Sequence, residues 1–277
     1  MRNAKVITVH IQKGGAGKTT MTSFLGGELG ARGYKVLLLD TDKQKNLTVN
    51  FRLKFKEDDP EQKKKNIYNF IIDSTKKDFD PFEYIIPTEF DNIDMVPAVS
   101  DQPSISKELD AYNLGRLEFV SKALEGLKHA YDFIIIDCGL DLDVLSYNCY
   151  QASDYIIVPV NPEPNTKECI PPTYAFLESN MEHNPNLKAG VVFLNVDTRE
   201  SISHSTMASV IEGMKDICKI FDIQIRRDTN VKQAQDYRVP INLFAPKTKA
   251  SQDVAMLIDE LLIELKRVCP EKMEGVL

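Results

Sequence analysis

Short apolar runs rich in β-branched residues alternate along this chain with segments of helical length. Parallel strands need such long connections, because the chain must cross back before it can run again in the same direction. Runs that are apolar at nearly every position also indicate strands covered on both faces. We therefore expect an α/β fold, with a doubly wound, mostly parallel sheet flanked by helices. The predicted strands are Lys5–Ile11, Lys35–Asp40, Ile93–Pro97, Phe133–Asp137, Tyr155–Val160, Gly190–Asn195 and Ile223–Ile225.

The same pattern bears on domain organisation. With 277 residues the chain is long enough for one large α/β domain, and we expect residues 1–277 to form a single one. A segment at about residues 52–66 interrupts the alternation and mixes lysines with acidic residues, which predicts a solvated loop excursion. The last helical pattern, which follows Lys247, has one apolar stripe and a mainly acidic opposite face. We expect it to pack on the sheet, and we expect no direct membrane attachment.

Charge and cysteine content exclude several classes of protein. The net charge of −7 provides no attraction of the whole protein to nucleic acid or anionic lipid, so any such partner requires a local basic patch. The five cysteines are odd in number and form no C-x-x-C pair, which argues against a disulfide framework and against a zinc site. No apolar run approaches the ~20 residues of a membrane span, and no signal-peptide pattern is present, so we expect a cytoplasmic protein.

A glycine-rich loop joins the first predicted strand to a helical pattern and reads QKGGAGKTT from Gln12 to Thr20. Glycines let backbone N–H groups surround phosphate oxygens, while the N-terminus of the helix adds the positive end of its dipole. The usual phosphate loop has glycine at position 12, but the strand–loop–helix context still predicts one here. Lys18 would reach the β- and γ-phosphates, and Thr19 would bind Mg²⁺. The predicted phosphate-binding residues are Gly14, Gly15, Ala16, Gly17, Lys18, Thr19 and Thr20.

A second lysine, Lys13, opens the glycine run. With it, the loop resembles the Lys-Gly-Gly-x-Gly-Lys-[Ser/Thr] signature of the deviant Walker A ATPases, the ParA/MinD family. The resemblance implies a P-loop ATPase that forms a homodimer when ATP is bound. In that dimer Lys13 would cross to the partner's phosphates and neutralise charge on the transferred phosphoryl group, so Lys13 and Lys18 would both be catalytic. The residues alone leave open a solvated surface lysine at position 13.

An acidic motif after the second predicted strand extends the resemblance. The run LLLDTDKQKNLT is similar to the family's Asp-x-Asp-Pro-Gln-Gly-Asn-x-Thr motif, with Lys43 and Lys45 in place of its proline and glycine. The resemblance implies that Asp42 is catalytic, because it orients the attacking water, and that Asp40 supports the Mg²⁺ shell. Without the family, both aspartates can be explained as turn or helix-capping residues.

A third motif supports a metal-dependent nucleotide site. The buried run that ends at Asp137 looks like a Walker B strand, whose aspartate would hold Mg²⁺ through water. ATP and Mg²⁺ are therefore the implied cofactors. The nitrogenase iron protein shares this phosphate loop but needs a cysteine-ligated cluster, and no cysteine precedes Cys138 to complete one.

Two further sets of residues are candidates for base and DNA contacts. Asn195 ends a predicted strand and Asp228 follows another, at positions where relatives contact adenine, and an amide and a carboxylate can read a purine edge. Motifs in the C-terminal half resemble the ParA branch, which binds DNA non-specifically through basic side chains. Arg199 and Arg227 are the DNA-binding candidates that this resemblance implies. Other basic residues that could join them on one face are Lys215, Lys219, Arg226 and Lys232.

These features lead to an expected function. The resemblance implies a slow, partner-stimulated ATP hydrolase that acts in plasmid or chromosome partition through ATP-dependent, non-specific DNA binding. A centromere-binding or other stimulating protein would be its partner, and the protein would associate with the nucleoid. The alternative is an ATPase of the same family that positions a protein assembly or a membrane-associated cargo without segregating DNA. A metabolic kinase is a third class, for which no acceptor-binding residues stand out.

Overall fold

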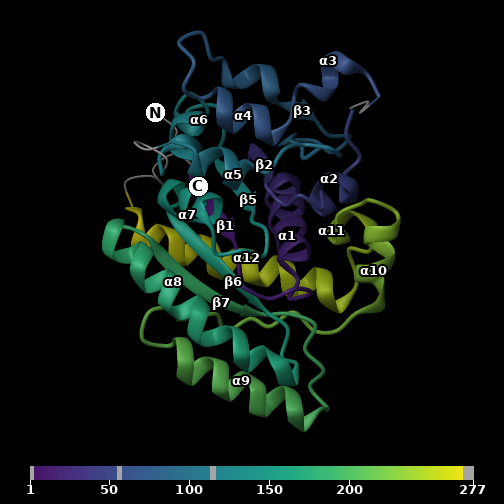
Figure 1. The fold of residues 1–277 in the computed structure, drawn as a ribbon. Helices are drawn as coiled ribbons and strands as arrows, with labels where there is room; N and C mark the ends of the chain where they lie inside the picture. Colours follow the sequence, from purple (N-terminus) through teal and green to yellow (C-terminus); the bar gives the residue numbers. More distant parts are fainter. Residues whose placement is uncertain (1–2, 55–57, 113–116, 271–277) are drawn as a thin grey trace.

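The computed structural model describes residues 3–54, 58–112 and 117–270 (Figure 1). Eight strands form one sheet in the order β3-β4-β2-β5-β1-β6-β7-β8. All neighbours are parallel except β3 and β4. The strands are β1 (Lys5–Val9), β2 (Val36–Asp40), β3 (Ile86–Pro87), β4 (Ile93–Val96), β5 (Phe133–Asp137), β6 (Tyr155–Val160), β7 (Lys188–Phe193) and β8 (Lys219–Ile220).

Helices cover both faces of this sheet, as Figure 1 shows. The α-helices are α1 (Lys18–Ala31), α2 (Asn46–Asn50), α3 (Pro60–Lys63), α4 (Ile67–Asp73), α5 (Ile105–Asp110), α6 (Phe119–Glu125), α7 (Val144–Ala152), α8 (Ile170–His183), α9 (Ser201–Met214), α10 (Thr229–Asp236), α11 (Ile241–Phe244) and α12 (Lys249–Val268). The 3₁₀ helices are η1 (Pro81–Tyr84) and η2 (Pro164–Cys169).

Alternate residues of each strand enter different cores. On β2, Leu38 packs with residues of α1 and α12, whereas Leu37 and Leu39 pack with α4, α6 and α7. Residues of β6 and β7 form a third core with α8 and α9. Because each buried strand is apolar on both sides, the sheet needs helices on both faces. The expected doubly wound α/β fold is therefore confirmed.

The last helix follows the sequence expectation. Six apolar residues of the predicted stripe are buried against the sheet: Val254, Leu257, Ile258, Leu261, Leu262 and Leu265. The helix begins at a Thr248 N-cap, whose hydroxyl accepts from the backbone N–H of Ser251, and it contacts α1. Its burial shows that the apolar stripe is used for packing within the chain.

The predicted strand Ile223–Ile225 is wrong. The edge strand is β8, residues 219–220, and its ladder with β7 ends there. The backbone N–H groups of Asp222 and Ile223 donate to the Glu260 carboxylate of α12, each at 3.1 Å, instead of to a strand. Further along, the backbone N–H of Ile225 donates to the Phe193 carbonyl of β7 at 2.9 Å, and an isolated bridge joins Val196 and Arg226. The Glu260 side chain of α12 thus interrupts the pairing at residues 222–223, where the apolar pattern predicts a strand.

The short strand β3 and the segment at residues 52–66 also bear on the sequence prediction. The antiparallel edge strand β3 was not predicted, because its two residues, Ile86 and Pro87, are too few to form a pattern. The expected excursion at residues 52–66 includes residues 55–57, which lie outside the described part of the chain. Of the rest, Leu53 forms a bridge with Thr88 and residues 60–63 form the one-turn helix α3.

The strand order places the motif residues at one edge. Strand β5 lies between β2 and β1, and the carboxyl ends of all three point the same way. The loop after β1, the β2–α2 loop (residues 41–45) and the β5–α7 loop (residues 138–143) therefore meet there. Ligands of open parallel sheets bind at this edge.

Candidate functional site

The phosphate loop, residues 12–17, has the backbone that its glycines allow. Gly15 and Gly17 have φ angles of 72° and 90°, in the left-handed region that favours glycine. Gly17 is also the N-cap of α1, and no side chain caps this helix. The first N–H groups of α1 are therefore available to a ligand, and the helix dipole adds positive potential. A Cβ built on Gly14 or Gly15 meets no atom within 4 Å, so the loop borders open space suited to phosphate.

Lys18 lies inside this loop. Its ammonium group donates to the carbonyl oxygen of Lys13 at 3.0 Å and to that of Ile11 at 3.4 Å. Burial lowers the pKa of Lys18, and the nearby carboxylate of Asp137 opposes this shift. Because carbonyls orient the ammonium group without neutralising it, the charge remains to be matched by an anion such as phosphate.

Asp137 ends β5 and is surrounded by hydroxyl groups. Its Oδ2 accepts from Thr19 at 2.7 Å and its Oδ1 accepts from Thr22 at 3.2 Å. Asp40 stands directly opposite it in the register of β2 and β5. Burial, and then the charge of Asp40, raise the pKa of Asp137 well above its usual range. Two buried carboxyl groups this close require a proton or a cation to offset their charge.

Asp40 accepts hydrogen bonds from the backbone of the β2–α2 loop and of α2. Its Oδ2 accepts from the backbone N–H and the hydroxyl of Thr48, at 2.8 and 2.7 Å, and its Oδ1 accepts from the backbone N–H of Asp42 at 3.2 Å. Burial raises the pKa of Asp40 to about 6. In the same loop Lys45 has a φ of 49°, a conformation that glycine adopts at lower cost, and its ammonium group donates to the Ser100 hydroxyl.

Asp42 lies on the wall of the cavity that these loops enclose. Its Oδ1 accepts from the backbone N–H of Gln44 at 2.9 Å, which fixes the carboxylate against the loop. The residues described here provide no donor for its Oδ2. Asp42 therefore retains an acceptor that can receive a hydrogen bond from water in the cavity.

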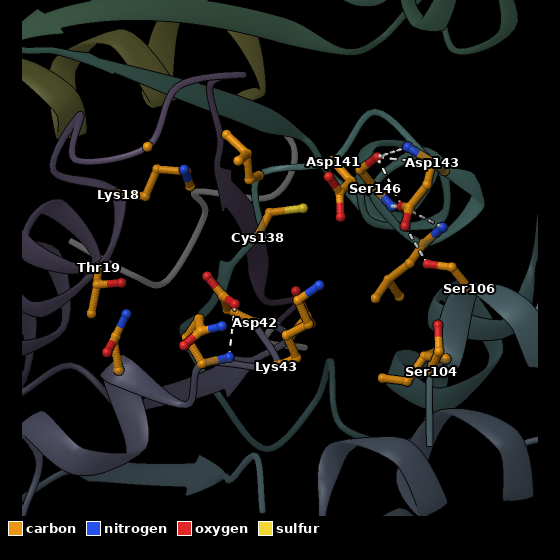
Figure 2. A pocket seen from close by; sticks show the side chains of 18 of the residues that line it. Lys18, Thr19, Asp42, Lys43, Ser104, Ser106, Cys138, Asp141, Asp143 and Ser146 are labelled. Carbon is orange, nitrogen blue, oxygen red and sulfur yellow. Dashed lines mark hydrogen bonds between the residues drawn. The ribbon is translucent and has the colours of Figure 1, made fainter. Parts of the chain in front are cut away.

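One cavity of about 850 Å³ connects these groups, a volume within the range of small-molecule sites. Its lining comes from the phosphate loop, the β2–α2 loop, the start of α5 and the β5–α7 loop. Figure 2 shows Lys18 and Thr19 on one side, Asp42 and Lys43 near the middle, and Ser104, Ser106 and Asp143 on the other side. Ser106 donates to Asp143, which is also the N-cap of α7, so the far wall ties α5 to α7.

The residues present fit magnesium bound together with a phosphate ligand. Within the described ranges no three His, Cys, Asp or Glu side chains converge on a metal-sized site. Mg²⁺ usually keeps several waters and takes one or two carboxylates plus phosphate oxygens, so such a cluster is not needed. Thr19 lines the cavity with Asp137 directly behind it. The hydroxyl and the buried carboxylates are the hard oxygen donors that this ion prefers.

Lys13 points away from the inside of the phosphate loop. Its ammonium group donates to Glu163 Oε2 at 2.9 Å and to Thr166 Oγ1 at 2.8 Å, at the start of η2. The side chain is 10% exposed, whereas that of Glu163 is 50% exposed. Lys13 and Lys18 thus leave the same loop in different environments. The structure brings Lys18, but not Lys13, among the carboxylates at the ends of β2 and β5.

Neither adenine candidate lines the described cavity. Asn195 has a φ of 52°, and its Oδ1 accepts from Arg227 at 3.3 Å. The preceding residue, Leu194, would collide with a Cβ on Gly17, which places this segment against the loop. Asp228 caps α10, since its Oδ1 accepts from the Asn230 backbone at 2.9 Å. Base contacts by either residue remain a prediction.

The DNA-binding candidates Arg199 and Arg227 share one carboxylate. Arg199 forms a bidentate pair with Asp197, with contacts of 2.9 and 2.8 Å, and Arg227 lies 3.6 Å from the same residue. Arg227 also lies 3.4 Å from Glu200. These guanidinium groups hold the pKa of Asp197 well below its usual range. The structure therefore brings the two arginines together on one exposed surface, although both are paired with acidic groups.

Three of the other basic candidates also have acidic partners. The pairs are Lys215 with Glu212 at 2.7 Å, Lys219 with Glu260 at 2.9 Å and Arg226 with Asp253 at 2.6 Å. No such pair involves Lys232 among the described residues. Most of these basic candidates are therefore engaged in local ion pairs.

Comparison with known proteins identifies the family. A family model described as an AAA domain matches residues 4–189. The sporulation initiation inhibitor protein Soj of Bacillus subtilis is 31% identical over 250 residues, which cover 90% of this chain and 94% of that protein. The chromosome partitioning protein ParA of Myxococcus xanthus is 30% identical over 261 residues, which cover 93% of this chain and 88% of that one. The chain belongs to the ParA/Soj/MinD-like family of deviant Walker A ATPases.

Structural comparison agrees with this family assignment. A crystal structure titled cobyrinic acid a,c-diamide synthase from Mycobacterium smegmatis, with bound ADP and magnesium, has a TM-score of 0.78 at 24% identity, and the match covers 95% of this chain and 96% of that one. The shared feature is the P-loop ATPase fold. In the described part of this ParA/Soj-like chain, no helix is both long and apolar enough to cross a bilayer.

Sequence reasoning missed several residues of the site. Glu163 and Thr166, the partners of Lys13, lie far from it in the chain and were not singled out. Their Glu-x-x-Thr spacing forms a capping box at η2, which is a signal for a helix start but not for a lysine partner. No sequence pattern indicates that Ser106 and Asp143 belong to the far wall, because the cavity exists only when α5 packs beside α7.

Proposed function

We propose that this chain is an ATP-dependent dimerising switch of the ParA type that hydrolyses ATP slowly and acts in plasmid or chromosome partition. The observation that carries the proposal is the separation of the two loop lysines. The ammonium group of Lys18 is held inside the phosphate loop by the carbonyls of Ile11 and Lys13, whereas that of Lys13 is held outside it by Glu163. Lys18 would serve the chain's own phosphates, and Lys13 would then be available for those of a second copy.

Each part of the site would have its own role in binding and hydrolysing ATP. The phosphate loop and Lys18 would bind the triphosphate, and Thr19 with Asp137 and Asp40 would hold the metal side of the site. Bound magnesium would neutralise charge on the phosphates. Asp42, fixed by the backbone of Gln44, would accept a hydrogen bond from the attacking water and orient it.

Dimerisation would complete this site. A lysine supplied by the second copy would offset charge that develops on the transferred phosphoryl group, so turnover would require the ATP-bound homodimer. The test is turnover and dimer formation in Lys13→Ala, measured by phosphate release and by light scattering. We expect ATP binding within about twofold of wild type and turnover at least ~100-fold lower. A monomeric Lys13→Ala variant that hydrolyses ATP at the wild-type rate would contradict the proposal.

DNA would be bound through the surface that contains Arg199 and Arg227. These side chains are 86% and 51% exposed. Asp228 follows Arg227 and accepts from the backbone N–H of Ala250 at 3.4 Å, which brings Lys249 to the same surface. The Asp197 side chain is only 8% exposed and would keep its arginine partners, but both guanidinium groups are exposed beyond it, so a DNA phosphate would be a further partner of either arginine. A centromere-binding or other stimulating protein would then set the hydrolysis rate on the nucleoid.

Salt-dependent binding to non-specific duplex DNA tests this part. With ATP and Mg²⁺ we expect binding that weakens as salt rises, and we expect Arg199→Ala and Arg227→Ala each to weaken it and lower the salt slope by about one. Lys122→Ala is the control, since Lys122 lies on α6 and pairs locally with Glu118.

A second function, positioning of a protein assembly or a membrane-associated cargo, is favoured by one observation. The basic candidates Arg199, Arg227 and Arg226 are matched by acidic partners, so the surface has little net positive charge. If the ATP-bound dimer binds no DNA at low salt while it still hydrolyses ATP, the partition role fails and this second function is preferred.

A further inference from the structure

Gln235 also lines the cavity, although no sequence motif includes it. It lies near the end of α10, 215 residues from Thr20 in the chain. Its side-chain amide nitrogen donates to the hydroxyl oxygen of Thr20 at 2.9 Å, and both side chains line the cavity. Gln235 is therefore a residue of this cavity to which the proposed mechanism gives no role.

The contacts of α10 with α11, and of α11 with α1, fix where Gln235 lies (Figure 1). The preceding residue, Ala234, is buried in the core that also contains residues of α1. Farther along α1, a Cβ on Gly27 would lie 2.5 Å from that of Pro240, so the two segments approach closely. Asn242 Nδ2 also donates to the Gly27 carbonyl at 3.0 Å. These contacts hold the Gln235 amide at the start of α1.

The direction of this hydrogen bond decides what the Thr20 hydroxyl can do. Thr20 is the third residue of α1, and the first turn of a helix is suited to binding phosphate. A hydroxyl has one proton and two acceptor lone pairs, so an oxygen that accepts from Gln235 keeps its proton for another partner. Among the described residues, no other hydrogen bond involves this hydroxyl. Its proton can therefore be donated to an anion in the cavity.

Thr19 provides the contrast, because its hydroxyl has the opposite arrangement. It donates its proton to Asp137 Oδ2 at 2.7 Å, which leaves its lone pairs for a cation. Thr20 accepts from an amide instead, which leaves its proton for an anion. The neighbouring hydroxyls at the start of α1 are thus oriented for the two charges of a metal–phosphate ligand, one by a carboxylate and the other by a carboxamide.

We propose that Gln235 is a positioning residue that directs the Thr20 hydroxyl proton toward a phosphate oxygen of the bound nucleotide. This inference rests on the proposed function, because it requires a nucleotide in the cavity. Gln235 acts through Thr20 and not by touching phosphate itself. Hydrogen bonds to an ionised acceptor are stronger than those between neutral groups, so a hydroxyl that loses this orientation binds phosphate less tightly.

A double-mutant cycle separates this role from simple packing. The ligand is ADP with Mg²⁺, because ADP is not turned over, and affinity is measured by isothermal titration calorimetry. Gln235→Met keeps the length of the side chain but removes the donor, and we expect affinity to fall about three- to tenfold. In Thr20→Val, which has no hydroxyl, adding Gln235→Met should change affinity by less than about 1.5-fold. In Thr20→Ser, which keeps the hydroxyl, the loss should return.

Gln233→Met is the matched control, since Gln233 is exposed on the same helix and does not line the cavity. It should bind ADP as the wild-type chain does. Gln235→Leu, which also lacks the donor, is measured in parallel, so that the conclusion does not depend on the folding of one variant.

Two results would overturn the inference alone. One is an equal loss of affinity from Gln235→Met with and without the Thr20 hydroxyl. The other is unchanged or tighter binding in Gln235→Met, which would mean that the amide oxygen faces Thr20 and takes its proton. A wild-type chain that binds neither ADP nor ATP would overturn the proposed function, and this inference with it.

Discussion

Lys13 on the phosphate loop and Glu163 before η2 form an ion pair of 2.9 Å within one chain. This contact engages the lysine that, under the proposed function, must reach a second copy. The pair must therefore break before the dimer can become active. Under the proposed function this ion pair would oppose dimerisation.

Glu163→Gln is expected to favour the ATP-bound dimer. The substitution removes the charge that holds Lys13, and partly exposed ion pairs contribute ~0.2–1 kcal/mol. The midpoint of ATP-dependent dimerisation should move to about two- to fivefold lower protein concentration, as measured by analytical ultracentrifugation. Glu168→Gln is the matched control, because this exposed carboxylate lies on the same segment without contacting Lys13. An equal shift of the dimerisation midpoint in both variants would show that the Lys13–Glu163 ion pair does not oppose dimerisation.

Lys18→Met is expected to abolish tight nucleotide binding without unfolding the chain. Methionine keeps the buried aliphatic stem but lacks the ammonium group that the Lys13 carbonyl orients. Loss of a buried charged partner costs ~2–5 kcal/mol, so ATP affinity should fall at least ~30-fold by fluorescence titration. Lys13→Ala serves as the comparison and should retain affinity. Near-wild-type affinity in Lys18→Met would show that the loop backbone binds phosphate alone.

Asp40→Asn is expected to stabilise the nucleotide-free chain more at pH 8 than at pH 4. Burial raises the pKa of Asp40 from 3.8 to about 6, so the folded chain holds this proton more tightly than the unfolded chain does. Ionisation therefore removes stability as pH rises through this window, and a neutral amide avoids the loss. Denaturant titrations should show a gain about 1–2 kcal/mol larger at pH 8. An equal gain at both pH values would mean that ionisation of Asp40 does not destabilise the folded chain.

Gly190→Ala is expected to destabilise the sheet. A Cβ at this position would lie 2.4 Å from the Phe221 ring and 2.6 Å from the Tyr155 hydroxyl. Overpacking of this kind costs ~1–3 kcal/mol, which thermal or denaturant unfolding can measure. Gly139→Ala is the control, since a Cβ there meets no atom within 4 Å. Equal stability of the two variants would show that β7 and Phe221 can move apart.

Much of the fold and part of the site could be predicted because the information is local. Buried strands such as β5 and β6 are apolar at each position, and the phosphate loop joins a strand to a helix in consecutive residues. The parallel order of β2, β5 and β1 then brings Asp40 and Asp137 opposite each other. For these features a short stretch of chain determines the geometry that its chemistry needs.

The amino-acid order by itself determined the α/β class, the phosphate loop and the three aspartates, since each depends on neighbours along the chain. Only the tertiary structure decided what distant segments do to them. It directed the backbone N–H groups of Asp222 and Ile223 to Glu260 of α12 instead of to β7, and it paired Lys13 with Glu163. Such contacts join side chains far apart in sequence, and no periodicity or spacing records which of them will meet.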